Sequence, residues 1–218
     1  MEDSRIIAMR GYDDISWGLL MFSKDPMKKK IPEENVRSII EHALNAGYAA
    51  AEVWLSEHAG ESFGEWIRSG KLKIVLNEKT QSPHYALLSI FEEKSERVTL
   101  FQDSISRVSA AASESVPELE ESEDVSSLIL AHEYFHYMEY HKMVGFGGYD
   151  MFAVKTIFGM KRTLKLIAYS EIAANAFAKK VCAVNFFPAL LDVLLLSTFD
   201  KANIDKYELW FKANGFDN

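Results

Sequence analysis

The sequence predicts an α+β fold in which a small sheet with antiparallel pairing precedes a helical part. Residues 71–102 carry alternating or near-continuous apolar side chains, as strands with a buried face do. From about residue 122 onward the pattern is helical instead, and strands followed by helices are typical of α+β domains. The 218 residues, 48% of them hydrophobic, can bury one sizeable core, so we expect a single domain over residues 1–218.

Residues 1–60 are predicted to form an N-terminal helical region, for which the sequence indicates no role. Pro32, followed by two glutamates, is typical of the first turn of a helix. Apolar residues then recur on one helical face, at Val36, Ile39, Ile40, Ala43 and Leu44. Gly47 is either the end of this helix or a weak point within it.

Three strands are predicted for the sheet, over residues 72–76, 85–91 and 98–102. The charged residues 92–97 form the turn between the second and the third strand, and we expect all three to pair as an antiparallel meander. Residues 104–112 are predicted to form a short helix. The polar, acidic residues 113–123 are predicted to form a mobile loop.

Helices are predicted for the remainder of the chain. One begins near Ser122, Asp124 or Ser126, each of which can cap it, and runs to about Met143, where a glycine-rich segment ends it. Further helices are expected over residues 151–160, 162–184, 188–199 and 207–213. The apolar segment 181–199 resembles a membrane span, but polar residues and Pro188 interrupt it, so we interpret it as two buried helices.

The charge and the cysteine content argue against several partners and locations. A net charge of −8 disfavours binding to nucleic acid, which requires a positively charged surface. A membrane partner is not expected either. The single cysteine, Cys182, excludes an internal disulfide, and no charged-then-apolar leader opens the chain, so a cytoplasmic location is favoured.

The main functional signal is the pattern His132-Glu133-x-x-His136 on a predicted helix. Histidines four residues apart lie on one helical face and can bind one Zn²⁺, while the glutamate acts as a general base. Apolar neighbours such as Leu130 and Ala131 favour a buried position for this helix. The competing interpretation is a core helix whose histidines form hydrogen bonds with the backbone.

A catalytic zinc site requires a third protein ligand, and three nearby residues are poor candidates. Lys142 occupies the position at which metzincins carry a third histidine. Glu139 lies about 10 Å along the helix axis from His132, too far for both to bind one ion together with His136. His141 faces the opposite side of the helix.

Glu171 is the better candidate for the third ligand. It shares a predicted helical face with Ala174 and Ala178, where a carboxylate is unusual unless it is paired or binds a metal. Asn175, one turn further on, is placed to accept a hydrogen bond from the second nitrogen of a ligand histidine. The competing interpretation of Glu171 is an ordinary surface glutamate.

Two motifs, Ala131-His132-Glu133-x-x-His136 and Glu171-x-x-Ala174-Asn175-x-Phe177-Ala178, resemble those of the ImmA/IrrE family of intracellular metallopeptidases, a branch of the gluzincins. The resemblance covers about residues 70–190. It implies a zincin-like fold with the first motif on the active-site helix. It also implies that both histidines and the distant glutamate hold zinc, that Glu133 is the catalytic base, and that Asn175 supports the site.

We therefore expect a zinc metallopeptidase that binds one Zn²⁺ and hydrolyses a peptide or protein substrate, with Glu133 as general base. Tyr149, Tyr169, His141 and His84 are possible oxyanion donors, and residues 98–102 are a possible sheet edge for a substrate strand. The alternative is a catalytically silent zinc-binding interaction or sensor module on the same fold, with Phe135 crowding the site. A metal-free structural protein is the third hypothesis.

Overall fold

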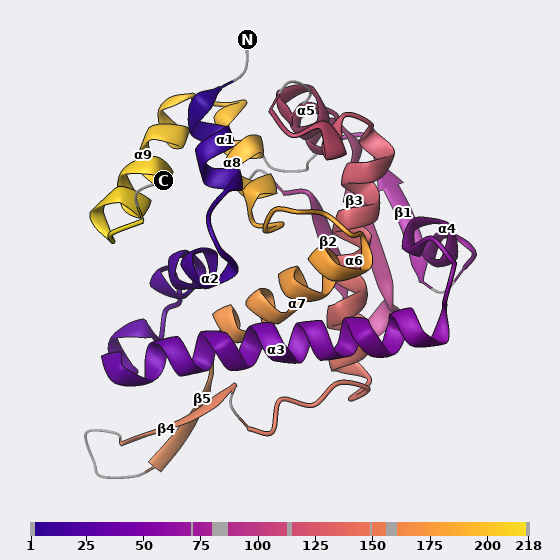
Figure 1. The fold of residues 1–218 in the computed structure, drawn as a ribbon. Helices are drawn as coiled ribbons and strands as arrows, with labels where there is room; N and C mark the ends of the chain where they lie inside the picture. Colours follow the sequence, from indigo (N-terminus) through magenta and orange to yellow (C-terminus); the bar gives the residue numbers. More distant parts are fainter. Residues whose placement is uncertain are drawn as a thin grey trace.

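The computed structural model describes residues 3–70, 72–79, 87–112, 115–148, 150–155 and 161–216. Its α-helices are α1 (Ser4–Arg10), α2 (Asp14–Ser23), α3 (Glu33–Glu57), α4 (Phe63–Arg68), α5 (Gln102–Ala112), α6 (Ser122–Tyr140), α7 (Ile167–Val181), α8 (Leu190–Ser197) and α9 (Ala202–Ala213). Its strands are β1 (Lys73–Asn77), β2 (Ser89–Glu92), β3 (Arg97–Phe101), β4 (Met151–Lys155) and β5 (Lys161–Lys165). Short 3₁₀ helices cover Lys28–Lys30, Glu93–Ser95 and Pro117–Leu119. The predicted α+β class is confirmed (Figure 1).

The three-stranded sheet is mixed, with the strand order β1-β3-β2. β2 pairs with β3 in antiparallel fashion, but β1 pairs with β3 in parallel, so the predicted antiparallel meander is wrong. The reason lies in burial, because β3 carries fully buried side chains such as Val98 and Leu100, whereas β1 and β2 alternate between partial and full exposure. The most apolar strand therefore takes the centre, and β2 becomes an edge.

A β-hairpin replaces the helix that was predicted over residues 151–160 and the start of the next one. β4 and β5 pair in antiparallel register, with Met151 opposite Lys165. The prediction of continuous helix was wrong here because apolar residues are also spaced two apart, with residues of high strand propensity such as Val154 and Thr163. Residues 156–160 lie outside the described part. The hairpin projects away from the remaining elements beneath α3 (Figure 1).

Gly47 lies in the middle of α3 and neither ends nor interrupts it. A Cβ atom on this residue would lie 2.1 Å from the backbone oxygen of Ala173 and 2.8 Å from the Cβ of Ala176, both in α7. The glycine therefore permits a close approach of two helices, which cross in Figure 1. Packing against α3 fixes the position of α7, the helix that carries Glu171.

α6 begins and ends slightly differently from the prediction. Its N-cap is Glu121, which makes no side-chain cap, while Ser122 and the other predicted caps lie within the helix. It ends at Tyr140, where Lys142 takes a left-handed φ of 56°. The amide of Met143 then donates to the carbonyl of Met138 over 2.8 Å, so a Schellman-type turn stops the helix before the glycines.

The N-terminal and C-terminal helices share one hydrophobic core. Trp17 of α2 is fully buried, and its ring lies 5.0 Å from that of Phe211 in α9 and 6.4 Å from that of Phe187. α7 ends at Val181 and α8 begins after Pro188, as predicted for two helices broken at this proline. Within the described residues, we find no helix with the length and apolar character needed to cross a membrane.

Candidate metal centre

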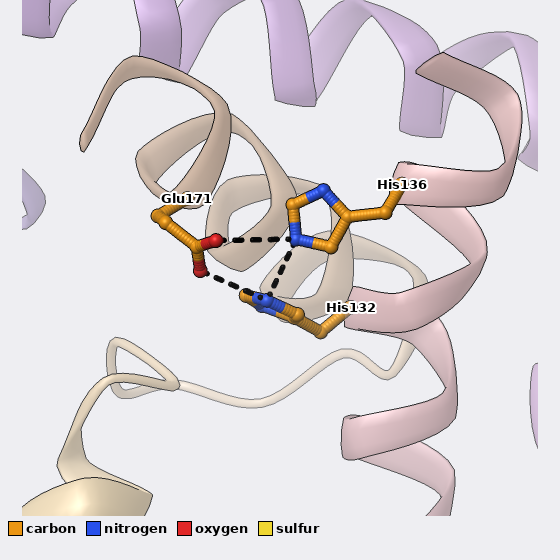
Figure 2. A group of neighbouring side chains, drawn as sticks. All are labelled: His132, His136 and Glu171. Carbon is orange, nitrogen blue, oxygen red and sulfur yellow. Dashed lines mark hydrogen bonds and ion pairs between the residues drawn. The ribbon is translucent and has the colours of Figure 1, made fainter. Parts of the chain in front are cut away.

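α6 and α7 bring His132, His136 and Glu171 together (Figure 2). The Nε2 atoms of the two histidines lie 3.1 Å apart. The Glu171 carboxylate faces both rings, with Oε2 3.2 Å from Nε2 of His132 and Oε1 3.5 Å from Nε2 of His136. Two imidazole nitrogens and a carboxylate from separate helices thus converge on one point.

The spacing of these donor atoms fits a single zinc ion. Ligands about 2.0–2.1 Å from a tetrahedral zinc lie roughly 3.3–3.4 Å from one another. The three separations above bracket that value, and the donor set of two imidazoles and one carboxylate is a usual one for a catalytic zinc. The three side chains can therefore hold one metal ion with little movement.

The charges of His132 and Glu171 compensate one another. Burial acts to lower the pKa of His132, but the hydrogen bond and the charge of Glu171 outweigh it and raise this pKa to about 9. Burial acts to raise the pKa of Glu171, but His132 and then His136 lower it to about 2. A proton on His132 therefore balances the carboxylate, and a metal ion has to displace that proton when it binds.

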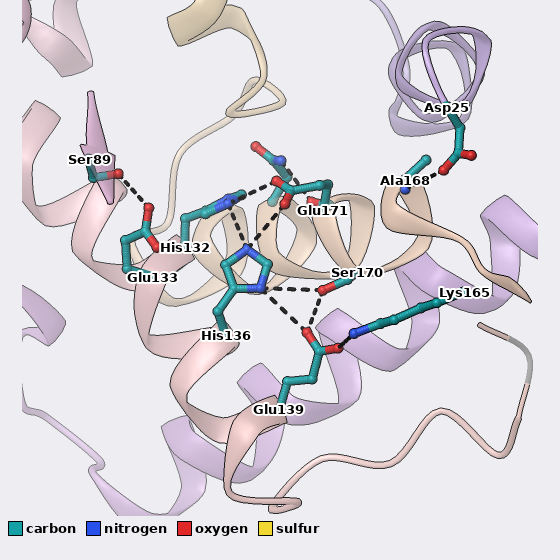
Figure 3. A network of polar contacts seen from close by, with 11 residues as sticks. Asp25, Ser89, His132, Glu133, His136, Glu139, Lys165, Ala168, Ser170 and Glu171 are labelled. Carbon is teal, nitrogen blue, oxygen red and sulfur yellow. Dashed lines mark hydrogen bonds and ion pairs between the residues drawn. The ribbon is translucent and has the colours of Figure 1, made fainter. Parts of the chain in front are cut away.

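Asp25 holds the N-terminal end of α7, a contact that no local sequence pattern predicts. Its side chain is buried, and Oδ2 accepts a hydrogen bond of 2.8 Å from the amide of Ala168 (Figure 3). Oδ1 accepts another, of 2.6 Å, from the amide of Met27. Asp25 thus caps a helix from a distant segment, at a point one turn before Glu171.

Glu139 and Ser170 contact the second nitrogen of His136. Nδ1 of His136 lies 3.4 Å from Oε2 of Glu139 and 3.3 Å from the hydroxyl of Ser170, which itself donates to Glu139 (Figure 3). Lys165 forms a 2.6 Å ion pair with Glu139. Burial opposes ionisation of Glu139, but His136, Lys165 and Ser170 together lower its pKa to about 2. Glu139 is thus placed to orient His136, a role that its spacing of three residues could have indicated.

Asn175 makes a different contact from the expected one. Its side-chain amide donates a 2.8 Å hydrogen bond to the backbone carbonyl of Glu171, and the residue is buried. Between the described residues, no hydrogen bond joins Asn175 to either histidine; Ser170 and Glu139 take that place on His136. Asn175 lies in the wall of the same cavity, so it shapes the site through the backbone of the Glu171 helix.

Glu133 opens onto the same cavity, which has a volume of about 720 Å³. Its side chain is buried, and Oε1 accepts a hydrogen bond from the hydroxyl of Ser89 on β2 (Figure 3). Ser89, Ile90 and Phe91 all line this cavity. The sheet edge beside the site is therefore β2, and the expectation of an edge at residues 98–102 is wrong, because they belong to the central strand β3 and the start of α5.

Two of the expected oxyanion donors, His141 and Tyr169, do not line the cavity. His141 pairs with Glu96 over 3.0 Å, and Tyr169 is fully buried with its hydroxyl 2.5 Å from His42. Tyr149 and His84 lie outside the described residues. Among the described tyrosines, Tyr140 does line the cavity, one turn beyond His136. Tyr140 follows His136 by four residues and therefore shares its helical face, so the sequence could have indicated this position.

Phe135 does not crowd the site, contrary to the expectation. Its side chain is fully buried on the core side of α6, where its ring lies 5.8 Å from that of Phe177 and 6.1 Å from that of Phe146. The cavity therefore stays open around His132, His136, Glu171 and Glu133.

Comparison of the chain with models of protein families, with curated proteins and with solved structures gave no match.

Proposed function

We propose that this protein is a zinc-dependent metallopeptidase with a zincin-like fold, of the gluzincin type that the ImmA/IrrE family represents. The convergence of His132, His136 and Glu171 around one point, with Glu133 on the same cavity, is the observation that carries the proposal. The proposal includes a cytoplasmic location, which suits a protein whose one cysteine, Cys182, is a free thiol.

The residues of the chain would divide the chemistry as follows. His132, His136 and Glu171 would hold the ion. When bound, zinc would supply a Lewis acid that lowers the pKa of water to about 7 and polarises a peptide carbonyl. Because Oε1 of Glu133 accepts the Ser89 hydroxyl, Oε2 is the oxygen left to take a proton from water and return it to the leaving amine.

The edge strand β2 offers a place for the substrate backbone. Among the described strands, β2 pairs with β3 on one side and with no strand on the other, and its residues line the cavity beside Glu133. An extended peptide could add to this edge through main-chain hydrogen bonds, which would lay a peptide bond across the metal centre. Side chains of the peptide would then point alternately toward α6 and toward solvent.

Two substitutions test the proposal, with zinc measured by elemental analysis and hydrolysis measured on a broad set of fluorogenic peptides. Glu171→Ala is expected to lose zinc and activity together. Glu133→Gln is expected to keep zinc while hydrolysis falls by about 100- to 10,000-fold, because the general base is lost. Glu123→Gln is the matched control, since Glu123 lies on α6 but pairs with the distant Arg68 over 2.7 Å.

Two results would contradict the proposal. Equal hydrolysis by the Glu133→Gln variant and the unsubstituted protein would remove Glu133 from the chemistry. Stoichiometric zinc with no hydrolysis of any peptide would instead support the catalytically silent zinc-binding module.

A further inference from the structure

The cavity beside the metal centre has two ends of different chemistry. α6 runs along it, so that Leu128 and Ile129 lie one turn before His132, while Glu139 and Tyr140 lie one turn after His136. Buried apolar residues of α6, of the segment before α8 and of its first turn line the cavity on the His132 side: Leu128, Ile129, Pro188, Ala189 and Leu191. This end forms an apolar pocket within the cavity.

Asp192 is the charged side chain at the apolar end. It lies in the first turn of α8, lines the cavity and interacts electrostatically with His132 and Glu171, which places it on the His132 side. The Asp192 side chain is exposed to solvent, while the atoms packed around it raise the pKa of its carboxyl through desolvation. An exposed carboxylate thus lies beside the apolar residues of this end of the cavity.

Within the described residues, no hydrogen bond or ion pair reaches the carboxylate of Asp192. Lys24 acts on it electrostatically, but the Lys24 ammonium donates to the Tyr207 hydroxyl over 3.0 Å and lies 4.5 Å from the centre of that ring. The Lys24 ammonium therefore lies against Tyr207. The carboxylate is therefore accessible to a cation from outside the protein.

The other carboxylates around the cavity already have partners. Glu139 pairs with Lys165, Glu133 accepts the Ser89 hydroxyl, and Glu93 at the far end interacts with Lys165. A bound Zn²⁺ would balance the charges of Glu171 and Glu133, one each. Asp192 would then be the negative charge at the His132 end that remains without compensation.

We propose that Asp192 selects substrates that place a positively charged group, an ammonium or a guanidinium, at the apolar end of the cavity. The inference rests on the proposed peptidase function and names its substrate class. The apolar walls would contact the aliphatic stem of a lysine or arginine side chain, while Asp192 binds its charged end. The α-amino group at the start of a peptide offers the same chemistry from a second source.

Peptide binding to the zinc-loaded Glu133→Gln variant measures this selectivity without hydrolysis. The probes are fluorescent, acetylated and amidated octapeptides of leucine and alanine, with either lysine or norleucine at each inner position in turn. Lysine is expected to bind about two- to fivefold more tightly than norleucine at one position, as an ion pair with an exposed carboxylate would give. Unacetylated norleucine peptides test the amino terminus as the source of the cation.

Two further substitutions in this background locate the effect. Asp192→Asn is expected to bring the lysine-to-norleucine affinity ratio, or the free-to-acetylated ratio, close to one. Glu93→Gln is the matched control, because it removes the same charge from the opposite end of the cavity, and it is expected to keep the ratio. Thermal unfolding of each variant checks that the fold is intact.

The outcomes separate this inference from the proposed function. Ratios near one for every peptide with Asp192 intact would overturn cation selection, and so would an equal fall in Asp192→Asn and Glu93→Gln. Hydrolysis is measured separately, on the norleucine peptides with Glu133 present. If none is hydrolysed while the binding ratios hold, the peptidase function fails but cation recognition by Asp192 stands.

Discussion

At the scale of single residues, the proposed metal centre includes side chains that would not bind the metal themselves. Glu139 and Ser170 both contact Nδ1 of His136, and this leaves Nε2 directed at His132 and Glu171. Contacts of this kind fix the tautomer and the direction of a ligand ring before the metal arrives. The affinity for zinc is therefore expected to depend on Glu139 and Ser170 as well as on the three ligands.

Replacing Glu139 with glutamine is expected to weaken zinc binding by about 10- to 100-fold, because a neutral amide holds His136 less firmly. Competition with a chromophoric chelator measures the affinity. His141→Gln is the matched control, since His141 follows the same helix but pairs with Glu96 away from the cavity. Equal zinc affinities for the two variants would show that Glu139 does not position the ligand.

The sequence was sufficient for the residues that follow local rules. His132, His136 and Glu133 lie within two helical turns, so their relative placement follows from helix geometry alone. Glu171 could be singled out because a carboxylate among alanines is unusual. The contact of Asp25 with Ala168 has no such local signature, because 143 positions separate the two residues and only the tertiary fold joins them.

At the scale of elements, the approach of α3 to α7 determines where Glu171 lies. Gly47→Ala is expected to lower the free energy of unfolding by about 1–3 kcal/mol, because the new methyl group would overlap the backbone oxygen of Ala173. Urea denaturation measures the loss. Gly145→Ala is the control, since a Cβ there would meet no atom within 4 Å. Similar stabilities of the two variants would mean that the helices separate without cost.

The limits of prediction are also clearest for the elements. Helical periodicity located α3, α5 and α6, because each helix satisfies its own backbone hydrogen bonds. The pairing of strands is different, since partners such as Lys73 and Arg97 are far apart in sequence and the order depends on which strand is most buried. The hairpin β4–β5 was taken for helix because short apolar runs fit both periods.

At the scale of the whole molecule, the site makes the stability of the metal-free protein depend on pH. The pKa of His132 is raised from 6.5 to about 9, so its contribution is complete below pH 6.5 and is lost as the pH rises through 9. The pKa of Glu171 is lowered from 4.5 to about 2, so its contribution is complete above pH 4.5 and is lost as the pH falls toward 2.

The free energy of unfolding in the presence of a chelator is therefore expected to be greatest, as far as this pair is concerned, between pH 4.5 and 6.5. Glu171→Gln should remove the fall between pH 6.5 and 9, because His132 then lacks its partner. Denaturation at a series of pH values measures both curves. An unchanged alkaline slope in Glu171→Gln would contradict the pairing, and Glu41→Gln, on the exposed face of α3, is the control.

The hydrogen bond by which Asp25 caps α7 also affects when the site can form during synthesis of the chain. A nascent chain that has emerged only as far as α6 carries Asp25 and both histidines, but neither Glu171 nor the helix that Asp25 caps. Contacts so distant in sequence form late, because closing a long loop costs entropy. A ribosome-bound chain that lacks α7 would thus hold zinc weakly, and firm capture of the metal would have to wait until α7 has emerged and packed against α6.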